Sequence, residues 1–162
     1  MKRLYFILFT LLCAMMAHAQ EIQTVTTKEL FKEVEKIEHV KDIKINPFMM
    51  SIARVAAPDN SKEMLKQVNS MRMFFLGECS QEDIQRFTER ISGVEINGFE
   101  KPVEETSENG ARSRVFMKTK GDYIEEVIVA TLDKENTCLI YMKGELTQET
   151  LIKMSQRDSI PQ

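Results

Sequence analysis

The stretch of residues 112–144 constrains the fold of this chain most strongly. It holds three runs rich in β-branched and aromatic residues, each followed by turn residues: 112–120, 123–132 and 137–143. Connections as short as Gly121-Asp122 join neighbouring antiparallel strands. The stretch therefore predicts a three-stranded meander near the end of the chain.

Helix starts are marked by five residues whose side chains can accept a free backbone amide: Thr26, Asn46, Ser61, Ser80 and Thr147. Apolar residues follow each of them at helical spacing, which predicts five amphipathic helices. The first start also fits a capping box, because Glu29 can reach back to Thr26. Gly93 predicts the end of the helix that begins after Ser80.

Three further strands are expected before the meander. Residues 39–45 alternate apolar and charged side chains, which is typical of a half-buried strand. Residues 71–76 are apolar on both faces and predict an interior strand, in which Arg72 requires an acidic partner or a place at the sheet rim. We expect the third strand over 99–103, followed by a mobile loop over 104–111.

The order of these elements predicts an α+β fold. We expect an antiparallel or mixed β-sheet with a C-terminal meander and with helices packed on one face, because consecutive strands do not suit a doubly wound parallel sheet. Residues 20–162 are expected to form a single domain with loose ends at 20–25 and 155–162, of a size that buries about two-thirds of its unfolded surface.

The first nineteen residues have the pattern of a cleaved signal peptide. Lys2 and Arg3 form a basic start, residues 4–12 are almost entirely apolar, and Ala17-His18-Ala19 offers small residues to a signal peptidase. The apolar run is too short for a membrane-spanning helix, which needs about 20 residues. We therefore predict cleavage before Gln20, and no transmembrane segment in the mature chain.

Cys13 raises the possibility of a lipid anchor, because bacterial lipoprotein signals end in a lipidated cysteine. That processing site requires a small residue before the cysteine, whereas Leu11 and Leu12 stand there and the apolar run continues beyond it. The sequence thus favours a soluble exported protein over a lipid-anchored one, located in the periplasm or at the cell surface.

The charge balance argues against a nucleic-acid partner. The chain has 22 basic and 25 acidic residues and a net charge of −3, and removal of Lys2 and Arg3 makes the mature chain more acidic. Non-specific binding to nucleic acid requires a basic surface.

No residue pattern indicates an enzyme, so we predict no catalytic residues and no cofactor. His39 is the one histidine after residue 19 and has no triad pattern around it. Cys79 precedes a helix, but neighbouring acidic residues would raise the pKa of its thiol. The carboxylates of Glu125 and Glu126 are expected to point to opposite faces of a strand.

Sulfur-containing residues leave two further possibilities open. Cys79 and Cys138 could form a disulfide in an oxidising compartment, or they could be two partly buried free thiols. Thioether ligands for Cu(I) could come from methionines, and the candidates are Met49, Met50, Met71 and Met73. Methionines at alternating strand positions also serve as flexible core filling.

Three segments resemble one known family. They are a strand that runs into Asn46-Pro47-Phe48-Met49-Met50, the apolar run over 71–76, and the closing segment 140–146 before a short helix. The family consists of small exported proteins of Gram-negative bacteria and is known only as a domain of unknown function. Many of its members resemble lipoproteins, a pattern from which Cys13 departs. The resemblance implies no activity, cofactor or catalytic residue.

These observations lead to two hypotheses about function. The first is a non-catalytic interaction or binding module in the cell envelope, whose partner is another envelope protein. The alternative is a redox or copper-handling role through Cys79, Cys138 and the methionines. The first hypothesis requires an apolar surface patch or an uncovered strand edge. The sequence leaves the ligand, the oligomeric state and the strand order open.

Overall fold

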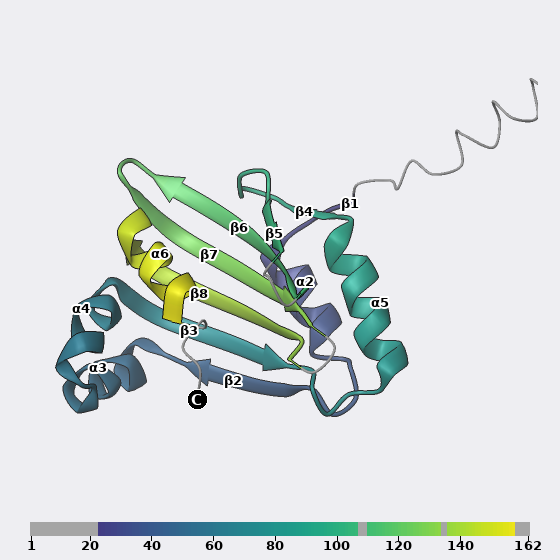
Figure 1. Ribbon diagram of the computed structural model, residues 1–162, viewed down its shortest axis with the longest axis horizontal. Coiled ribbons are helices and arrows are strands. Elements are labelled where there is room, and N and C mark those ends of the chain that lie inside the picture. Colours follow the sequence, from purple (N-terminus) through teal and green to yellow (C-terminus); the bar gives the residue numbers. More distant parts are fainter. Residues whose placement is uncertain (1–22, 107–109, 134–135, 158–162) are drawn as a thin grey trace, which may run out of the picture.

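The structure is a computed structural model and describes residues 23–106, 110–133 and 136–157. Its centre is a six-stranded antiparallel sheet in the order β2-β3-β8-β7-β6-β5 (Figure 1). These strands are β2 (Lys41–Ile45), β3 (Val68–Phe75), β5 (Val103–Thr106), β6 (Arg112–Lys120), β7 (Tyr123–Leu132) and β8 (Cys138–Leu146). A small second sheet pairs β1 (Gln23–Val25) with β4 (Val94–Ile96) in parallel. The helices are α2 (Thr27–Val34), α3 (Pro47–Ala56), α4 (Asp59–Gln67), α5 (Gln81–Ser92) and α6 (Gln148–Arg157).

The predicted fold class and the meander are confirmed. Strands β6, β7 and β8 follow one another in the chain and lie side by side in the sheet. Gly121 forms the turn between β6 and β7 with a φ of +62°, a conformation that glycine adopts without strain. Strand β3 is an interior strand between β2 and β8, as the apolar run at 71–76 predicted.

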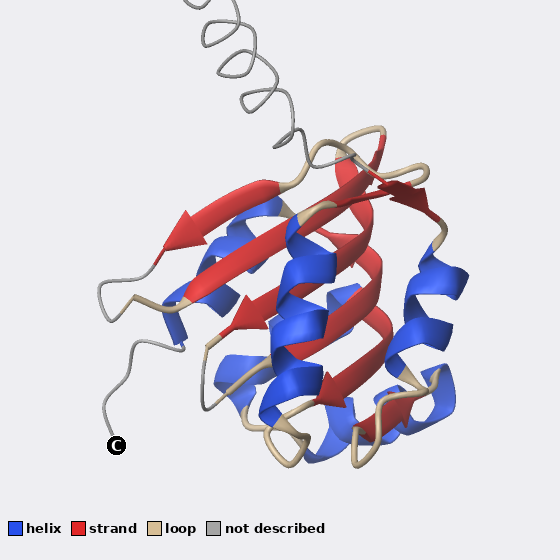
Figure 2. Cartoon of the chain, turned by 90° about the vertical axis from the view of Figure 1, so that its right-hand side faces the viewer, coloured by secondary structure: helices blue, strands red, loops and turns tan. Residues whose placement is uncertain are grey.

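Helices α2 and α5 cover one face of the sheet (Figure 2). Their buried side chains, among them Leu30 and Phe87, pack against strand residues such as Phe74 and Leu139. The Phe31 ring lies 5.5 Å from the Phe74 ring, centroid to centroid, in a tilted arrangement. This core matches the single cover of helices that the sequence predicted.

The opposite face carries a second, partial cover that the prediction did not include. Helices α3, α4 and α6 gather over one end of the sheet, as Figure 1 shows. Met50 of α3 is 1% exposed and belongs to a core with Val68 and Leu146. Because successive strand residues point to opposite faces, this second core is separated from the first by the sheet itself.

The helix starts follow the capping pattern with one exception. The capping box at Thr26 is present, with the Glu29 amide donating to Thr26 Oγ1 at 3.2 Å and the Thr26 amide donating to Glu29 Oε2 at 2.8 Å. The side chains of Asn46 and Ser80 also accept cap hydrogen bonds. The predicted cap at Ser61 is wrong, because α4 already begins at Asp59, whose carboxylate suits the positive end of the helix.

The strand prediction failed at the edge next to the meander. Residues 99–102 are not part of a strand, whereas 104–106, predicted as a loop, continue from Val103 as β5 and pair with β6. The polar sequence of β5 gives no periodic signal, and the strand is held by hydrogen bonds to its neighbour. An edge strand needs only one such neighbour.

The start of the domain was also wrongly expected to be loose. Residues Gln23–Val25 form β1, and the amide of Asn97 donates to the carbonyl of Val25 at 2.8 Å. The partner of β1 lies about 70 positions further along the chain, so no local pattern reveals the pairing.

Candidate interaction surface

One row of aliphatic side chains crosses the whole sheet on the face opposite α2 and α5. The strand register places these residues side by side, in the order Ile43, Met73, Ile140, Val129, Val115 and Val103. Five of them are half-buried, and Val103 at the edge is exposed. We call these six residues the open row.

The neighbouring row on the same face is covered by helices. It consists of Ile45, Met71, Met142, Val127 and Met117. Met50 and Ala53 of α3, Leu65 of α4 and Leu151 of α6 pack in the same apolar cluster. Val129 and Ile140 of the open row also pack against this cluster, so the helices stand over one end of the face and the open row lies at the border of their cover.

Helix α3 carries an exposed apolar stripe on the side that faces away from the covered row. Phe48, Ile52 and Val55 lie on one side of the helix and are 72%, 55% and 82% exposed, and Met49 is also exposed. We call these four residues the outer stripe. A helix with apolar residues on more than one side is typical of burial on more than one side.

The charge of α3 is turned away from this stripe. Arg54 is the one charged residue of the helix, and its guanidinium donates to the carbonyl of Leu65 at 2.9 Å and to that of Val68 at 2.6 Å. These bonds tie α3 to the end of α4 and the start of β3. The outer stripe is consequently free of charge.

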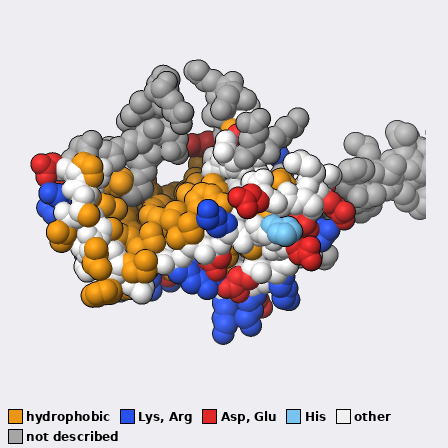
Figure 3. All heavy atoms as spheres, turned by 90° about the horizontal axis from the view of Figure 1, so that it is seen from below, with side chains coloured by type: hydrophobic (Ala, Val, Ile, Leu, Met, Phe, Trp, Pro, Cys, Tyr) orange, Lys and Arg blue, Asp and Glu red, His pale blue; other side chains and the backbone are white. Residues whose placement is uncertain are grey.

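All the large apolar side chains that are exposed in the described residues lie on this side of the molecule. Besides the outer stripe they are Val103, Phe75 and Ile152. Figure 3 shows hydrophobic side chains gathered over the end of the molecule that carries α3 and α4, and the surface is hollowed between them. The outer stripe, the open row, Phe75 and Ile152 together form what we call the apolar surface. A patch of this kind marks an interaction site in a folded protein.

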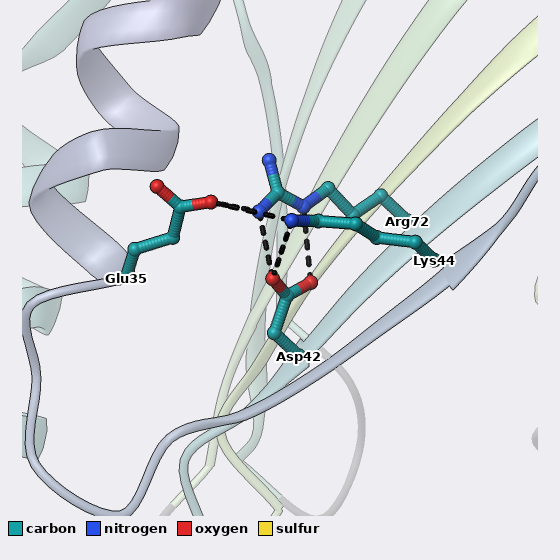
Figure 4. A network of polar contacts seen from close by, with 4 residues as sticks. All are labelled: Glu35, Asp42, Lys44 and Arg72. Atoms are coloured by element: carbon teal, nitrogen blue, oxygen red, sulfur yellow. Dashed lines mark hydrogen bonds and ion pairs between the residues drawn. The ribbon is translucent and has the colours of Figure 1, made fainter.

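The predicted partner of Arg72 is confirmed on the other face of the sheet. Its guanidinium donates to both carboxylate oxygens of Asp42, at 3.0 and 2.7 Å, and also bonds Glu35 at the end of α2 (Figure 4). It also stacks 4.5 Å from the centroid of the Phe74 ring and 5.2 Å from that of Phe31. The charge is thereby accommodated on an interior strand by acidic partners and aromatic rings.

The paired charges of this network indicate a structural role. The hydrogen bond from Arg72 lowers the pKa of Asp42 below its ordinary value, and a further bond from Lys44 adds to the effect. The same guanidinium lowers the pKa of Glu35. Every charge in the group is matched by an opposite one, so the network fastens α2 to β2 and β3 and leaves no group poised for proton transfer.

A second polar cluster brings together the carboxylates of Glu125 and Glu126, contrary to our expectation. Lys118 Nζ lies 2.8 Å from Glu126 Oε1 and 3.5 Å from Glu125 Oε2. The pairing of β7 with β8 shifts register between Ile124 and Glu126, which breaks the alternation of faces. Tyr141 donates to Glu126 at 2.7 Å. Burial raises the pKa of Glu126, but the bonds from Lys118 and Tyr141 outweigh it and hold that pKa below its usual value.

Cys79 and Cys138 are not joined by a disulfide in the structure. Cys79 is 8% exposed and belongs to the core under α2 and α5, where burial raises the pKa of its thiol and the carboxylates of Asp83 and Glu78 raise it further. Cys138 opens β8 on the opposite face, in register with Phe75. The disulfide between Cys79 and Cys138 stays a prediction, because the structure shows the two thiols without a bond between them.

The remaining candidate residues do not converge on a site. Met50 and Met71 share the core under α3, Met73 lies in the open row, and Met49 is exposed on the outer stripe. His39 is exposed at the turn before β2 with a φ of +65°. Within the described ranges, no three histidine, cysteine or acidic side chains are grouped as metal ligands would be.

A shallow cleft of about 90 Å³ lies between α2 and α5. Its floor is formed by apolar residues such as Val34 and Phe87, and Glu33 and Arg90 close one side through a bidentate ion pair at 2.9 and 3.0 Å. Ligand pockets for small molecules are several times larger, about 300–1,000 Å³. The cleft is consistent with ordinary helix packing.

Comparison with known proteins gives one match. A family model described as a domain of unknown function matches residues 31–154, which contain the whole six-stranded sheet, helices α3, α4 and α5, and parts of α2 and α6. No curated protein and no solved structure matches the chain. In the described part of the chain, none of the helices combines the length and the apolar character needed to cross a bilayer.

Proposed function

Because this chain belongs to the DUF4252 family, a domain whose function is unknown, we propose its function from its own surface: it is a non-catalytic interaction module of the cell envelope. The module binds another protein through the apolar surface. Export to the envelope rests on the signal-peptide pattern of residues 1–19.

The observation that carries this proposal is the one-sided distribution of exposed apolar side chains. Val55 is 82% exposed and Phe48 72%, while the α2/α5 side has no exposed large apolar residue among those described. Maintaining such side chains in water costs free energy, about 25 cal/mol for each Å². A bound partner would recover that free energy.

The chemistry of the surface suits a protein partner. It combines methionine, aromatic and aliphatic side chains, of which Met49 and Met73 can adapt their shape to a bound chain. The polar clusters around Arg72 and Glu126 are internally paired and lie on the other face. Nothing in this arrangement requires chemical turnover of a ligand.

Site-specific photo-crosslinking in the native host tests the proposal. A photo-reactive residue at Ile52, in the outer stripe, is expected to give one dominant protein adduct. The same residue at Gln85, exposed on α5, is the matched control and is expected to give only the background pattern. Equal adduct patterns from both positions would contradict a binding role for the apolar surface.

Export is tested separately by the mass of the protein purified from the envelope fraction. We expect a chain that begins at Gln20 and carries no lipid. Recovery of the intact chain from the cytoplasm would remove the envelope part of the proposal and leave the binding surface untouched.

The alternative of copper handling has less support from the geometry. Met50 is 1% exposed and packs with Met71 among aliphatic side chains, so the thioethers of these two candidates serve the core. Titration with Cu(I) under anaerobic conditions is therefore expected to leave the thermal midpoint unchanged. A rise in the midpoint that saturates at one equivalent would favour the alternative.

A further inference from the structure

We propose that the partner of the apolar surface is a second copy of this chain, bound in a two-fold symmetric dimer. This inference rests on the proposed function, since it names the partner of the same surface. It follows from self-complementarity: one molecule presents both an exposed helix stripe and a row of the sheet that its own helices cover only in part.

The fold itself shows that these two elements fit together. The inner side of α3, with Met50 and Ala53, already packs over the covered row of the sheet at Ile45 and Met71. The outer stripe has the same aliphatic and methionine character, and so does the open row that lies beside the covered one. A second copy can therefore repeat, between molecules, the helix-on-sheet contact that exists within one.

The exposed area is of the size that a stable dimer buries. The seven exposed large apolar side chains have exposed fractions between 37% and 82%. For side chains of this size, the fractions amount to on the order of 700 Å², close to the ~800 Å² that each partner buries in a standard interface.

The charges also favour this surface for self-association. The chain carries a net charge of −3, so two copies repel each other unless they meet where charge is absent. The open row has no charged residue, and the next row has two, Lys41 and Glu105, at opposite edges of the sheet. The apolar surface lets two copies approach without bringing like charges together.

The position of the helices selects the symmetry axis. Since α3, α4 and α6 stand over one end of the sheet face, they rise above the rest of that face. A two-fold axis that runs across the strands places the helices of each copy beyond the open row of the other. In this arrangement α3 of one copy meets Phe75 of the other, and the two-fold symmetry forms this contact twice.

The first test measures the mass of residues 20–162 in solution by sedimentation and light scattering. We expect a dimer with a Kd of about 10 µM or tighter. The double substitution Ile52→Glu with Val55→Glu is expected to weaken dimerisation at least about tenfold. The matched control adds the same charge on the other side of the molecule, by Thr24→Glu with Gln81→Glu, and is expected to dimerise as the unmodified chain does.

A second test separates loss of the interface from loss of folding. The single variants Val55→Glu and Phe75→Lys are each expected to be monomeric alone, with an unchanged far-UV circular dichroism spectrum. Mixed in equal amounts they are expected to form a heterodimer, because the new charges attract across one contact and the other contact is unmodified. If mixing restores no dimer, the proposed arrangement is wrong.

The outcomes distinguish this inference from the proposed function. A chain that stays monomeric to its solubility limit, but is crosslinked from Ile52 to a different protein in the host, would overturn the dimer and leave the interaction module standing. A dimer that both control and outer-stripe variants retain would show that another surface holds it, and would also overturn the inference.

Discussion

Arg72 shows how one charged residue is tolerated inside the most apolar strand of the chain. Its side chain is 16% exposed, bonded to two carboxylates and stacked on two rings. The partners come from the end of α2 and from β2, so the network joins α2 and β2 to β3. The residue therefore fixes the position of α2 over the sheet.

Asp42→Asn tests this role through pH. The pKa of Asp42 lies below its ordinary value of 3.8, so its stabilisation is complete above that pH and is lost as the pH falls through the lowered pKa. At pH 6 we expect the substitution to reduce the free energy of unfolding by about 1 kcal/mol. Urea titrations should show this difference vanish toward pH 2. Asp122→Asn, at an exposed turn, is the control, and a constant difference down to pH 2 would contradict the role.

Gly144 is required by a close approach of two backbones. A Cβ atom built there would lie 1.9 Å from the carbonyl oxygen of Gln67, next to the irregular pairing with Val68. Gly144→Ala is expected to cost about 3 kcal/mol of unfolding free energy, measured by urea titration. Gly93→Ala is the matched control, since its Cβ would lie 3.9 Å from the nearest atom, and a similar cost for both would contradict the argument.

Helix α3 has two apolar sides with different tasks. The inner side holds the second core through Met50, whereas the outer stripe contributes nothing to that core because it faces water. Two features explain why these residues form a helix: Asn46 caps the start, and Pro47 occupies the first helical position. They do not explain why both sides are apolar, for which the proposed partner gives a reason.

Substitutions on the two sides of α3 should therefore differ in effect. Met50→Ala is expected to reduce the free energy of unfolding by about 2–4 kcal/mol, because it leaves a cavity in the core. Val55→Ala should change it by less than about 0.5 kcal/mol when measured on dilute monomer. A large loss from Val55→Ala in dilute solution would mean that the outer stripe belongs to the fold and not to an interface.

At the scale of the whole molecule, the sheet divides the protein into two unequal halves. In the α2/α5 half the two helices cover the core, and the Arg72 network joins α2 to β2 and β3. The other half is closed at one end only, which leaves the open row and the outer stripe at the surface. Both proposals follow from this asymmetry.

The same division predicts the redox state of the thiols. Cys79 lies in one core, and Cys138 lies on the other face of the sheet, so we expect both to be free in the purified protein. Alkylation with N-ethylmaleimide in denaturant, without reductant, should add two labels to residues 20–162 by mass spectrometry. Labelling that requires prior reduction would instead establish the disulfide.

Sequence patterns were sufficient where the cause is local. The capping box at Thr26, the helix from Ser80 to Gly93, the meander and the need of Arg72 for an acidic partner all depend on neighbouring residues or on burial alone. Strands β1 and β5 were not predicted, because their own residues carry no periodic signal. Strand β1 is held by the remote strand β4, and β5 is held by the adjacent strand β6. The distribution of helices over two faces was likewise invisible in the sequence.

The sequence by itself determined the α+β class, the helix starts and the meander, because caps, turns and apolar periodicity act over a few residues. Only the tertiary structure decided which apolar residues are buried. Ile43, Met73, Ile140, Val129, Val115 and Val103 come from six separate strands, and nothing short of their register aligns them into one row. Whether helices cover that row depends on packing between distant elements, which is why the candidate interaction surface could be seen only in three dimensions.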